Sequence, residues 1–296
     1  MKLLDNLRPD WKIPKYSTDI IDLSNNICYD SVLIDKINYI INSVDFDVRQ
    51  YSDEYPLYDA ISKYHSVPIE HISLGFGLGE IIQRFFNRHQ SVAIVSPTWT
   101  MPEIFGKVRD ARVEIIKELK VTDCDILYVA TPNGVTGQTC NSQLIKKLCN
   151  HYKLIIVDEA YGEWADFESL INESIKTNIV VLKTLSKSLS VAGLRIGYAI
   201  ANKENTIYLQ THRPSCVTTS INTAIAGMLF DLIPEHINRM KQTKHYLENN
   251  FNCIPTQTNF VIFKNPPKGI NNFLTKKLDF GTRMALCDLE LVNCLK

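Results

Sequence analysis

Residues 179–200 read Ile179-Val-Val-Leu-Lys-Thr-Leu-Ser-Lys187-Ser-Leu-Ser-Val-Ala-Gly193-Leu-Arg195-Ile-Gly197-Tyr-Ala-Ile200, two apolar runs joined by a turn of small residues. Short, continuously apolar runs of this kind predict buried strands. Similar runs come earlier in the chain, mostly separated by helical stretches; they occupy 72–74, 92–95, 113–116, 126–130 and 154–157. Strands that alternate with helices in this way are typical of a mostly parallel sheet covered on both faces. The sequence therefore predicts an α/β fold with a three-layer αβα large domain.

The chain has 296 residues, of which 45% are hydrophobic, enough for one large domain and a smaller one. We expect residues 1–44 to form an N-terminal arm or small-domain segment and residues 45–210 the large domain. Residues 211–296 are expected to form a smaller, shortened α+β domain. That last segment contains helical stretches at 221–232 and 237–249 and a strand at 260–263.

The composition excludes several classes of partner. Lysine and arginine total 32, and aspartate and glutamate also total 32, so no global field favours nucleic acid or an anionic membrane. No apolar run has the length of a membrane span. The eight cysteines are scattered and never combine with histidine at metal-ligand spacing. We therefore expect a cytoplasmic protein with reduced thiols and no metal site.

Two basic residues of the opening stretch are candidates for chemistry. Lys187 follows an apolar strand, where partial burial favours the neutral amine that attacks an aldehyde. Arg195 lies eight residues further on, and its planar guanidinium suits a phosphate. Taken alone, each is more often a surface lysine or a structural arginine.

Other candidates lie where strands end, at the edge that forms the ligand crevice in such folds. Asp158 ends an apolar strand, and a buried carboxylate needs a cationic partner such as a protonated pyridine nitrogen. A helix cap or a Mg²⁺ ligand is an equal alternative. The glycines at 75, 77 and 79 open a helix whose free N–H groups suit a phosphate, although the spacing does not match a dinucleotide fingerprint. Trp99 suits stacking on a flat ring, unless it is a core tryptophan.

Together these segments resemble the fold-type I enzymes of the class I/II aminotransferases, and most closely the histidinol-phosphate aminotransferase group. The resemblance runs from about residue 20 to the end of the chain. Its specific parts are Asp158-Glu-Ala-Tyr161, the T-x-S-K pattern at 184–187 and the A-G-L-R-x-G-Y pattern at 192–198. The cofactor that this resemblance implies is pyridoxal 5′-phosphate (PLP).

The resemblance also implies roles for individual residues. Three are expected to be catalytic: Lys187 as a Schiff base with PLP and as the carrier of the substrate proton, Asp158 on the pyridinium nitrogen, and Tyr161 on the ring hydroxyl. Arg283 is expected to bind the distal anionic part of the substrate. Tyr51 would reach the PLP phosphate of a partner subunit, which implies a homodimer. The other implied cofactor contacts are Leu78, Gly79, Trp99, Asn133, Ser186 and Arg195.

The chain departs from the group at three places. The N-P-N-N-P-T-G loop reads Thr131-Pro-Asn-Gly-Val-Thr-Gly137, so Gly134 replaces the asparagine that contacts the ring hydroxyl, and Asn133 is only its neighbour. The N-terminal N-E-N-P motif reads Asn25-Asn26-Ile27-Cys28. The usual carboxylate-binding arginine aligns with Lys296.

The function that the resemblance implies is transfer of an amino group from a small amino acid or amino-phosphate-like donor to a keto acid. One alternative is a PLP-dependent decarboxylase or lyase resembling threonine-phosphate decarboxylase, which CO₂ release would distinguish. Another is a catalytically impaired PLP-binding homologue, which would bind the cofactor without turnover.

Overall fold

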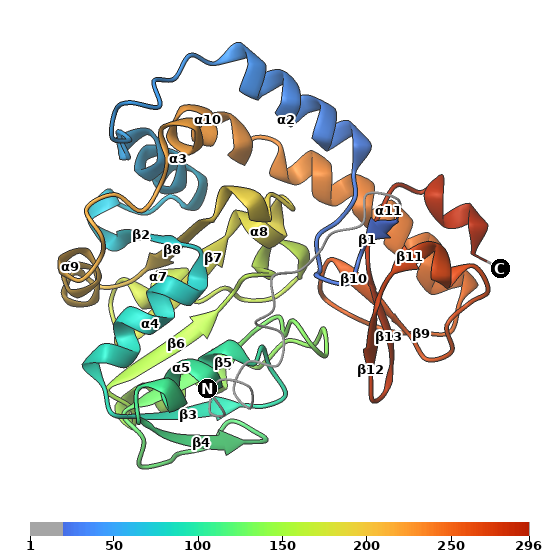
Figure 1. Ribbon diagram of the computed structural model, residues 1–296. Helices are drawn as coiled ribbons and strands as arrows, with labels where there is room; N and C mark the ends of the chain where they lie inside the picture. Colours follow the sequence, from blue (N-terminus) through green and yellow to red (C-terminus); the bar gives the residue numbers. More distant parts are fainter. Residues whose placement is uncertain (1–19, 296) are drawn as a thin grey trace.

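A seven-stranded sheet forms the centre of the computed structural model, which describes residues 20–295 (Figure 1). Its strand order is β2-β8-β7-β6-β5-β3-β4. Strands β7, β6, β5, β3 and β4 run parallel, whereas β8 is antiparallel to both of its neighbours. The predicted mostly parallel sheet is thus confirmed. Its strands are β2 (Ile72–Phe76), β3 (Ser91–Val95), β4 (Arg112–Ile116), β5 (Ile126–Ala130), β6 (Leu154–Asp158), β7 (Ile179–Thr184) and β8 (Ile196–Ile200).

Alternate residues of the central strands pack in opposite directions, which makes the three layers. In β6, Ile156 packs in a cluster with Phe85 of α4, while Ile155 and Val157 pack in another with Ile145 of α6. Because both faces are covered, nearly every residue of these strands is buried, as their unbroken apolar runs predicted. The helices of this part are α4 (Leu78–Arg88), α5 (Met101–Val108), α6 (Ser142–Lys147), α7 (Ile171–Ser174), α8 (Leu185–Ser188) and α9 (Lys203–Thr211).

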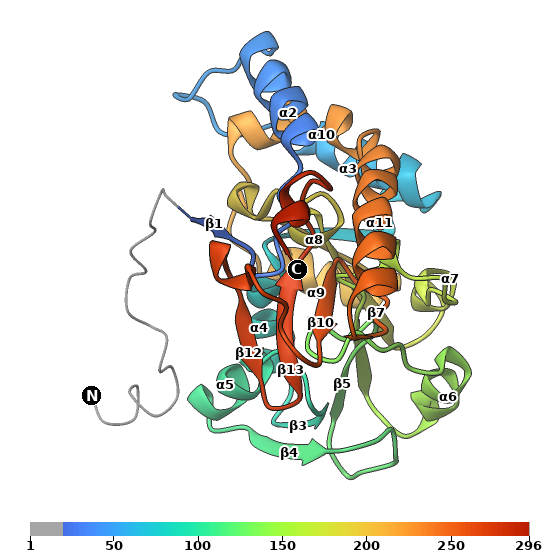
Figure 2. The same cartoon turned by 90° about the vertical axis from the view of Figure 1, so that its right-hand side faces the viewer.

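A second, antiparallel sheet lies beside the first, with the order β12-β13-β10-β9 (Figure 2). Helix α11 (Ile233–Asn250) packs against it. The N-terminal strand β1 (Ile21–Asp22) pairs with β11 (Phe273–Leu274), so the start of the described chain joins its C-terminal part. The strands of the second sheet are β9 (Cys253–Ile254), β10 (Phe260–Phe263), β12 (Lys276–Leu278) and β13 (Gly281–Ala285). The domain boundaries at 45 and 211 stay predictions.

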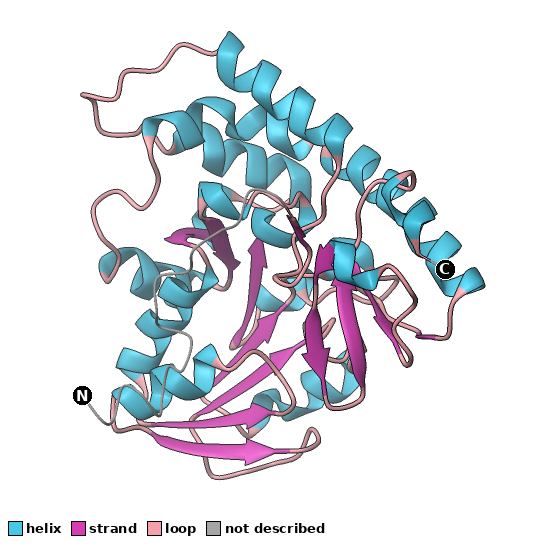
Figure 3. Cartoon of the chain, turned by 45° about the vertical axis from the view of Figure 1, so that its right-hand side comes forward, coloured by secondary structure: helices cyan, strands magenta, loops and turns pink. Residues whose placement is uncertain are grey.

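Helices α2 (Ser31–Ser43), α3 (Tyr55–His65) and α10 (Ser220–Phe230) cover one side of the molecule (Figure 3). Asp30 caps α2 and also accepts hydrogen bonds from His236 Nδ1 at 2.7 Å and Arg239 Nη2 at 2.8 Å, both on α11. Burial works to raise the pKa of Asp30, but these partners hold it well below its ordinary value. The charged cluster therefore fixes α2 to α11.

Strand β8 and the turn before α4 approach each other closely. A Cβ atom added to Gly197 would lie 2.7 Å from the carbonyl carbon of Gly77 and 2.9 Å from the nitrogen of Leu78. The first turn of α4 therefore sits directly on β8. Within residues 20–295, no helix combines the length and the apolar character that a membrane crossing requires.

Candidate active site

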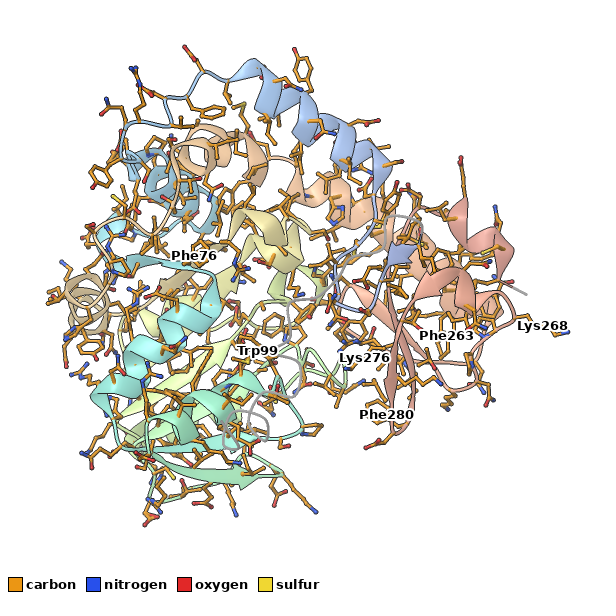
Figure 4. All side chains as sticks on the ribbon, viewed as in Figure 1. Phe76, Trp99, Phe263, Lys268, Lys276 and Phe280 are labelled. Carbon is orange, nitrogen blue, oxygen red and sulfur yellow. The ribbon has the colours of Figure 1, made fainter. Side chains whose placement is uncertain are left out.

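A cavity of about 660 Å³ lies where the carboxyl ends of the parallel strands face the N-terminal segment and β13. The large sheet contributes residues that follow β3, β5, β6 and β7, as expected for the crevice of such a sheet. Figure 4 labels Trp99 on this part of the molecule. The residues discussed below that line the cavity are Asn25, Asn26, Gly77, Leu78, Gly79, Thr98, Trp99, Gly134, Asp158, Tyr161, Ser186, Lys187, Arg195 and Arg283.

Lys187 lies in α8, the short helix that follows β7. Thr184 caps this helix by accepting a hydrogen bond from the backbone N–H of Ser186 at 3.1 Å. The Lys187 Nζ donates to the carbonyl oxygens of Asn25 at 2.7 Å and Asn26 at 3.3 Å. Burial, helped by the nearby positive charge of Arg283, lowers the pKa of Lys187 to about 8. Its amine therefore becomes neutral at a much lower pH than that of an exposed lysine.

Asp158 is the last residue of β6 and is only 6% exposed. The hydroxyl of Tyr128 donates to its Oδ2 at 2.6 Å, and the backbone N–H of Ala160 donates to its Oδ1 at 3.0 Å. Burial raises the pKa of Asp158, and the bond from Tyr128 opposes that rise. The sequence analysis missed Tyr128, although a tyrosine inside an aliphatic strand signals a buried hydroxyl that needs a partner.

Another part of the cavity lining has features that suit an anion. Gly77 has a φ of +73°, and the first N–H groups of α4 follow it at Leu78 and Gly79. The Arg195 guanidinium donates to the carbonyl of Ala192 at 3.1 Å and lies 5.3 Å from the ring centre of Phe76. A Cβ atom on Gly77 would collide with this guanidinium. Because Gly77 has no side chain, the Arg195 guanidinium can lie beside the first N–H groups of α4.

Tyr161 and Arg283 complete the cavity on the side of the small sheet. Tyr161 accepts a hydrogen bond from Asn26 Nδ2 at 2.7 Å, and burial raises its pKa above the ordinary value. Arg283, on β13, donates to the carbonyl oxygens of Gly134 at 2.9 Å and Ser24 at 3.0 Å. Burial lowers the pKa of Arg283. Both residues line the cavity, while their expected contacts with ring and substrate stay predictions.

Two predicted contacts are not brought to the cavity. Asn133 is turned into its own loop: its amide donates to the carbonyl of Pro97 at 2.7 Å and accepts from Val135 at 2.9 Å and Thr136 at 3.0 Å. Its polar atoms therefore shape the loop instead of lining the cavity. Tyr51 lies between α2 and α3 with 88% of its surface exposed, so this single chain does not test its role. Lys296 lies outside the described residues.

The side chains present fit PLP. One cavity is lined by the buried carboxylate of Asp158, the amine of Lys187, and the guanidinium of Arg195 beside the start of α4. Trp99 is 42% exposed and meets Phe105 edge-on, at an interplanar angle of 88°. Three buried polar atoms at the cavity have no hydrogen-bond partner in the described part of the chain: Thr98 Oγ1, Asn26 Oδ1 and Arg283 Nε. Such atoms are costly unless a ligand or water satisfies them.

The family profile described as "Aminotransferase class I and II" matches residues 75–287. The chain belongs to this family. A histidinol-phosphate aminotransferase of Thermoanaerobacter sp. (strain X514) is 28% identical over 262 residues, which cover 78% of this chain and 74% of that relative. The aminotransferases of this class are transaminases that use PLP, which confirms the predicted enzyme class and cofactor.

Two solved structures have the same fold. Histidinol-phosphate aminotransferase from Sinorhizobium meliloti, in complex with pyridoxal-5′-phosphate, has a TM-score of 0.78 and 15% identity, covering 93% of this chain and 89% of that one. L-threonine-O-3-phosphate decarboxylase from Porphyromonas gingivalis has a TM-score of 0.72 and 17% identity, covering 93% and 97%. At these identities the likeness establishes the fold alone.

We expect the hydrogen bond from Tyr128 to stabilise the ionised form of Asp158 and thereby to strengthen PLP binding. We expect Tyr128→Phe to weaken PLP binding about tenfold, because a hydrogen bond to a charged group contributes about 1.5–3 kcal/mol. The dissociation constant of PLP, followed by its absorbance, measures this. Tyr152→Phe is the matched control, since its hydroxyl bonds the carbonyl of Lys120 outside the cavity. Equal affinities for the two variants would contradict the role of Tyr128.

The lowered pKa of Lys187 sets the pH dependence of PLP uptake by the cofactor-free enzyme. Only the neutral amine attacks the aldehyde, so the uptake rate should rise with pH and level off above about 8. An unperturbed lysine would extend the rise to about pH 10.4. Stopped-flow absorbance between pH 6 and about pH 10 checks this. Lys244, whose pKa burial also lowers to about 8, donates to two backbone carbonyls away from the cavity, so Lys244→Met should leave the profile unchanged.

Proposed function

We propose that this aminotransferase transfers the amino group of a small amino acid or amino-phosphate-like compound to a keto acid, with Lys187 as the residue that carries PLP. The observation that supports it most is the placement of Lys187 and Asp158 on one cavity that also has an anion-binding end at Arg195. A lone lysine or aspartate would be as consistent with a structural role, whereas the combination of the two on one cavity supports the proposal.

In the proposed arrangement, each part of the cavity holds one part of the cofactor. Asp158 pairs with the ring nitrogen and Tyr161 with the ring hydroxyl, while Trp99 covers a face of the ring. The phosphate is held by Arg195 together with Ser186 and the N–H groups of Leu78 and Gly79. When bound, PLP supplies an electron sink that stabilises negative charge at the α-carbon of the substrate.

Lys187 is the group that moves the proton. In its neutral form, which a pKa of about 8 makes accessible near neutral pH, its amine would take a proton from the α-carbon of the substrate and pass it to the cofactor. The carbonyl oxygens of Asn25 and Asn26 hold the Nζ at the cavity wall, at 2.7 and 3.3 Å.

Arg283 is proposed to bind the anionic end of the substrate. Its guanidinium is oriented by the carbonyls of Gly134 and Ser24, and its Nε has no hydrogen-bond partner among residues 20–295. A cation held by neutral backbone groups keeps its full charge for an incoming carboxylate or phosphate. This supports an amino donor with a second, anionic group.

We further propose a homodimer in which Tyr51 reaches the partner subunit's cavity. Other large side chains of α2 and of the segment from there to the start of α3 are exposed as well, including Tyr39 at 75%, Val48 at 80% and Tyr55 at 64%. We expect Tyr51→Phe to weaken PLP binding severalfold, because one hydrogen bond is lost, while sedimentation shows an unchanged dimer. Tyr39→Phe, an equally conservative change on α2, is the control. A wild-type protein that sediments as a monomer would rule this arrangement out.

The decisive test of the proposed function is Lys187→Ala. The purified wild-type protein should show a visible absorption band of bound PLP that a panel of amino acids converts to the pyridoxamine form. The variant should lose both the band and the conversion, because no amine remains to bind the aldehyde. Lys153→Ala, which removes an exposed lysine paired with Asp125, should retain both. A band that survives Lys187→Ala would overturn the assignment of Lys187.

The same panel separates the alternatives. Release of CO₂ without keto-acid formation would favour the decarboxylase. Bound PLP that no amino acid converts would favour the catalytically impaired homologue.

A further inference from the structure

Asn26 occupies a fixed position between the two parts of the enzyme. It follows β1, is 4% exposed, and has a φ of +56°, a conformation that asparagine adopts more readily than most residues. Its carbonyl oxygen accepts hydrogen bonds from Asn259 Nδ2 at 2.9 Å and from Lys187 Nζ at 3.3 Å. Asn259 is fully buried and directly precedes β10. The backbone of Asn26 is thus held from both the small sheet and α8.

The contacts of the Asn26 amide define its orientation. Its Nδ2 lies 2.7 Å from the hydroxyl of Tyr161 and 3.3 Å from the carbonyl oxygen of Gly134. A carbonyl oxygen can only accept, so the atom facing Gly134 has to be the nitrogen. The amide therefore donates to Tyr161, and the hydroxyl proton of Tyr161 has to point elsewhere.

Gly134 leaves the space that this contact needs. A Cβ atom at position 134 would lie 2.9 Å from Cε2 and 3.3 Å from the hydroxyl oxygen of Tyr161. The loop therefore supplies only a backbone carbonyl here, which Arg283 and Asn26 both use. Although it is 108 residues away in the sequence, Asn26 provides the side-chain amide at this wall of the cavity.

We propose that Asn26 is a positioning residue that directs the hydroxyl proton of Tyr161 into the cavity. This rests on the proposed function, in which that proton is donated to the ring hydroxyl oxygen of PLP. With its oxygen engaged by Asn26, Tyr161 acts as a donor toward the ring. Without Asn26, the hydroxyl turns freely and the bond to the ring weakens.

Several other groups face Tyr161. The charged or titratable ones are Arg283, Asp158 and Cys28, on β13, at the end of β6 and in the N-terminal segment. Burial raises the pKa of Tyr161, whereas the hydrogen bond from Asn26 and the positive charge of Arg283 oppose that rise. Because the Asn26 amide also donates to the carbonyl of Gly134, the comparison in a Tyr161→Phe background is needed to isolate its bond to Tyr161.

The experiment compares Asn26→Gly, Tyr161→Phe and the double variant. Glycine accepts the positive φ and removes only the amide. The measured quantity is the pH midpoint of the visible absorption change of bound PLP. Loss of a donor beside the ring oxygen should raise the midpoint by about one pH unit in Tyr161→Phe and by about half a unit in Asn26→Gly. In the Tyr161→Phe background, Asn26→Gly should add no further shift.

A purely structural role for Asn26 gives a different result. An unchanged midpoint in Asn26→Gly, or the same shift with and without the Tyr161 hydroxyl, would overturn the proposal. Ser66→Gly is the matched control, because Ser66 also has a positive φ of +55° but ends α3, outside the cavity. Thermal melting of the cofactor-free variants verifies that they fold.

The two proposals fail in distinguishable ways. If wild-type protein shows no PLP band that depends on Lys187, the proposed function is wrong. If that band is present and only the Asn26→Gly midpoint is unchanged, the role of Asn26 alone is wrong.

Discussion

A buried carboxylate with only neutral hydrogen-bond donors governs the arrangement of this enzyme. Within the described part of the chain, Asp158 receives hydrogen bonds from the Tyr128 hydroxyl and the Ala160 N–H and forms no ion pair. Burying a charge without a counter-ion is costly. In the proposed function a protonated ring nitrogen would remove that cost, so cofactor binding and the charge of Asp158 would stabilise each other. Lys187, which follows β7, and Arg195, which precedes β8, line the same cavity as Asp158.

The cavity exists only because segments far apart in the sequence converge on it. Strand β1 pairs with β11, and the Ser24 carbonyl orients Arg283 on β13. The N-terminal segment thus belongs physically to the C-terminal part of the fold, although the two lie at opposite ends of the chain. It also supplies the two carbonyl oxygens that hold Lys187. Residues 24–26 thus contact both Lys187 and Arg283.

The sequence predicted the sheet well because its central strands β5, β6 and β7 are buried on both faces and consist largely of apolar residues. A run of apolar residues gives no information on the direction of its strand, so the antiparallel orientation of β8 could not be predicted from its residues. The start of α11 was predicted at 237, whereas the helix begins at Ile233 with Pro234 in its first turn. Proline is tolerated there because the first N–H groups of a helix have no internal partner.

Within the site, the residues at strand ends could be predicted, since parallel strands bring their carboxyl ends together. Asn133 could not, because its amide orientation depends on the loop geometry and not on its position in the sequence. Asn26 and Tyr128 were missed for a related reason. Their importance comes from a hydrogen-bond partner that only the folded chain brings near.

The contact between Gly197 and the backbone of Gly77 limits how this fold can vary. Any side chain at 197 displaces the backbone that starts α4, so neither natural drift nor redesign can alter that position without moving the anion-binding end. At Gly227 of α10, by contrast, an added Cβ atom would meet no neighbour within 4 Å. A side chain can therefore be added at that position, whereas the contact between β8 and the start of α4 has room only for a hydrogen atom.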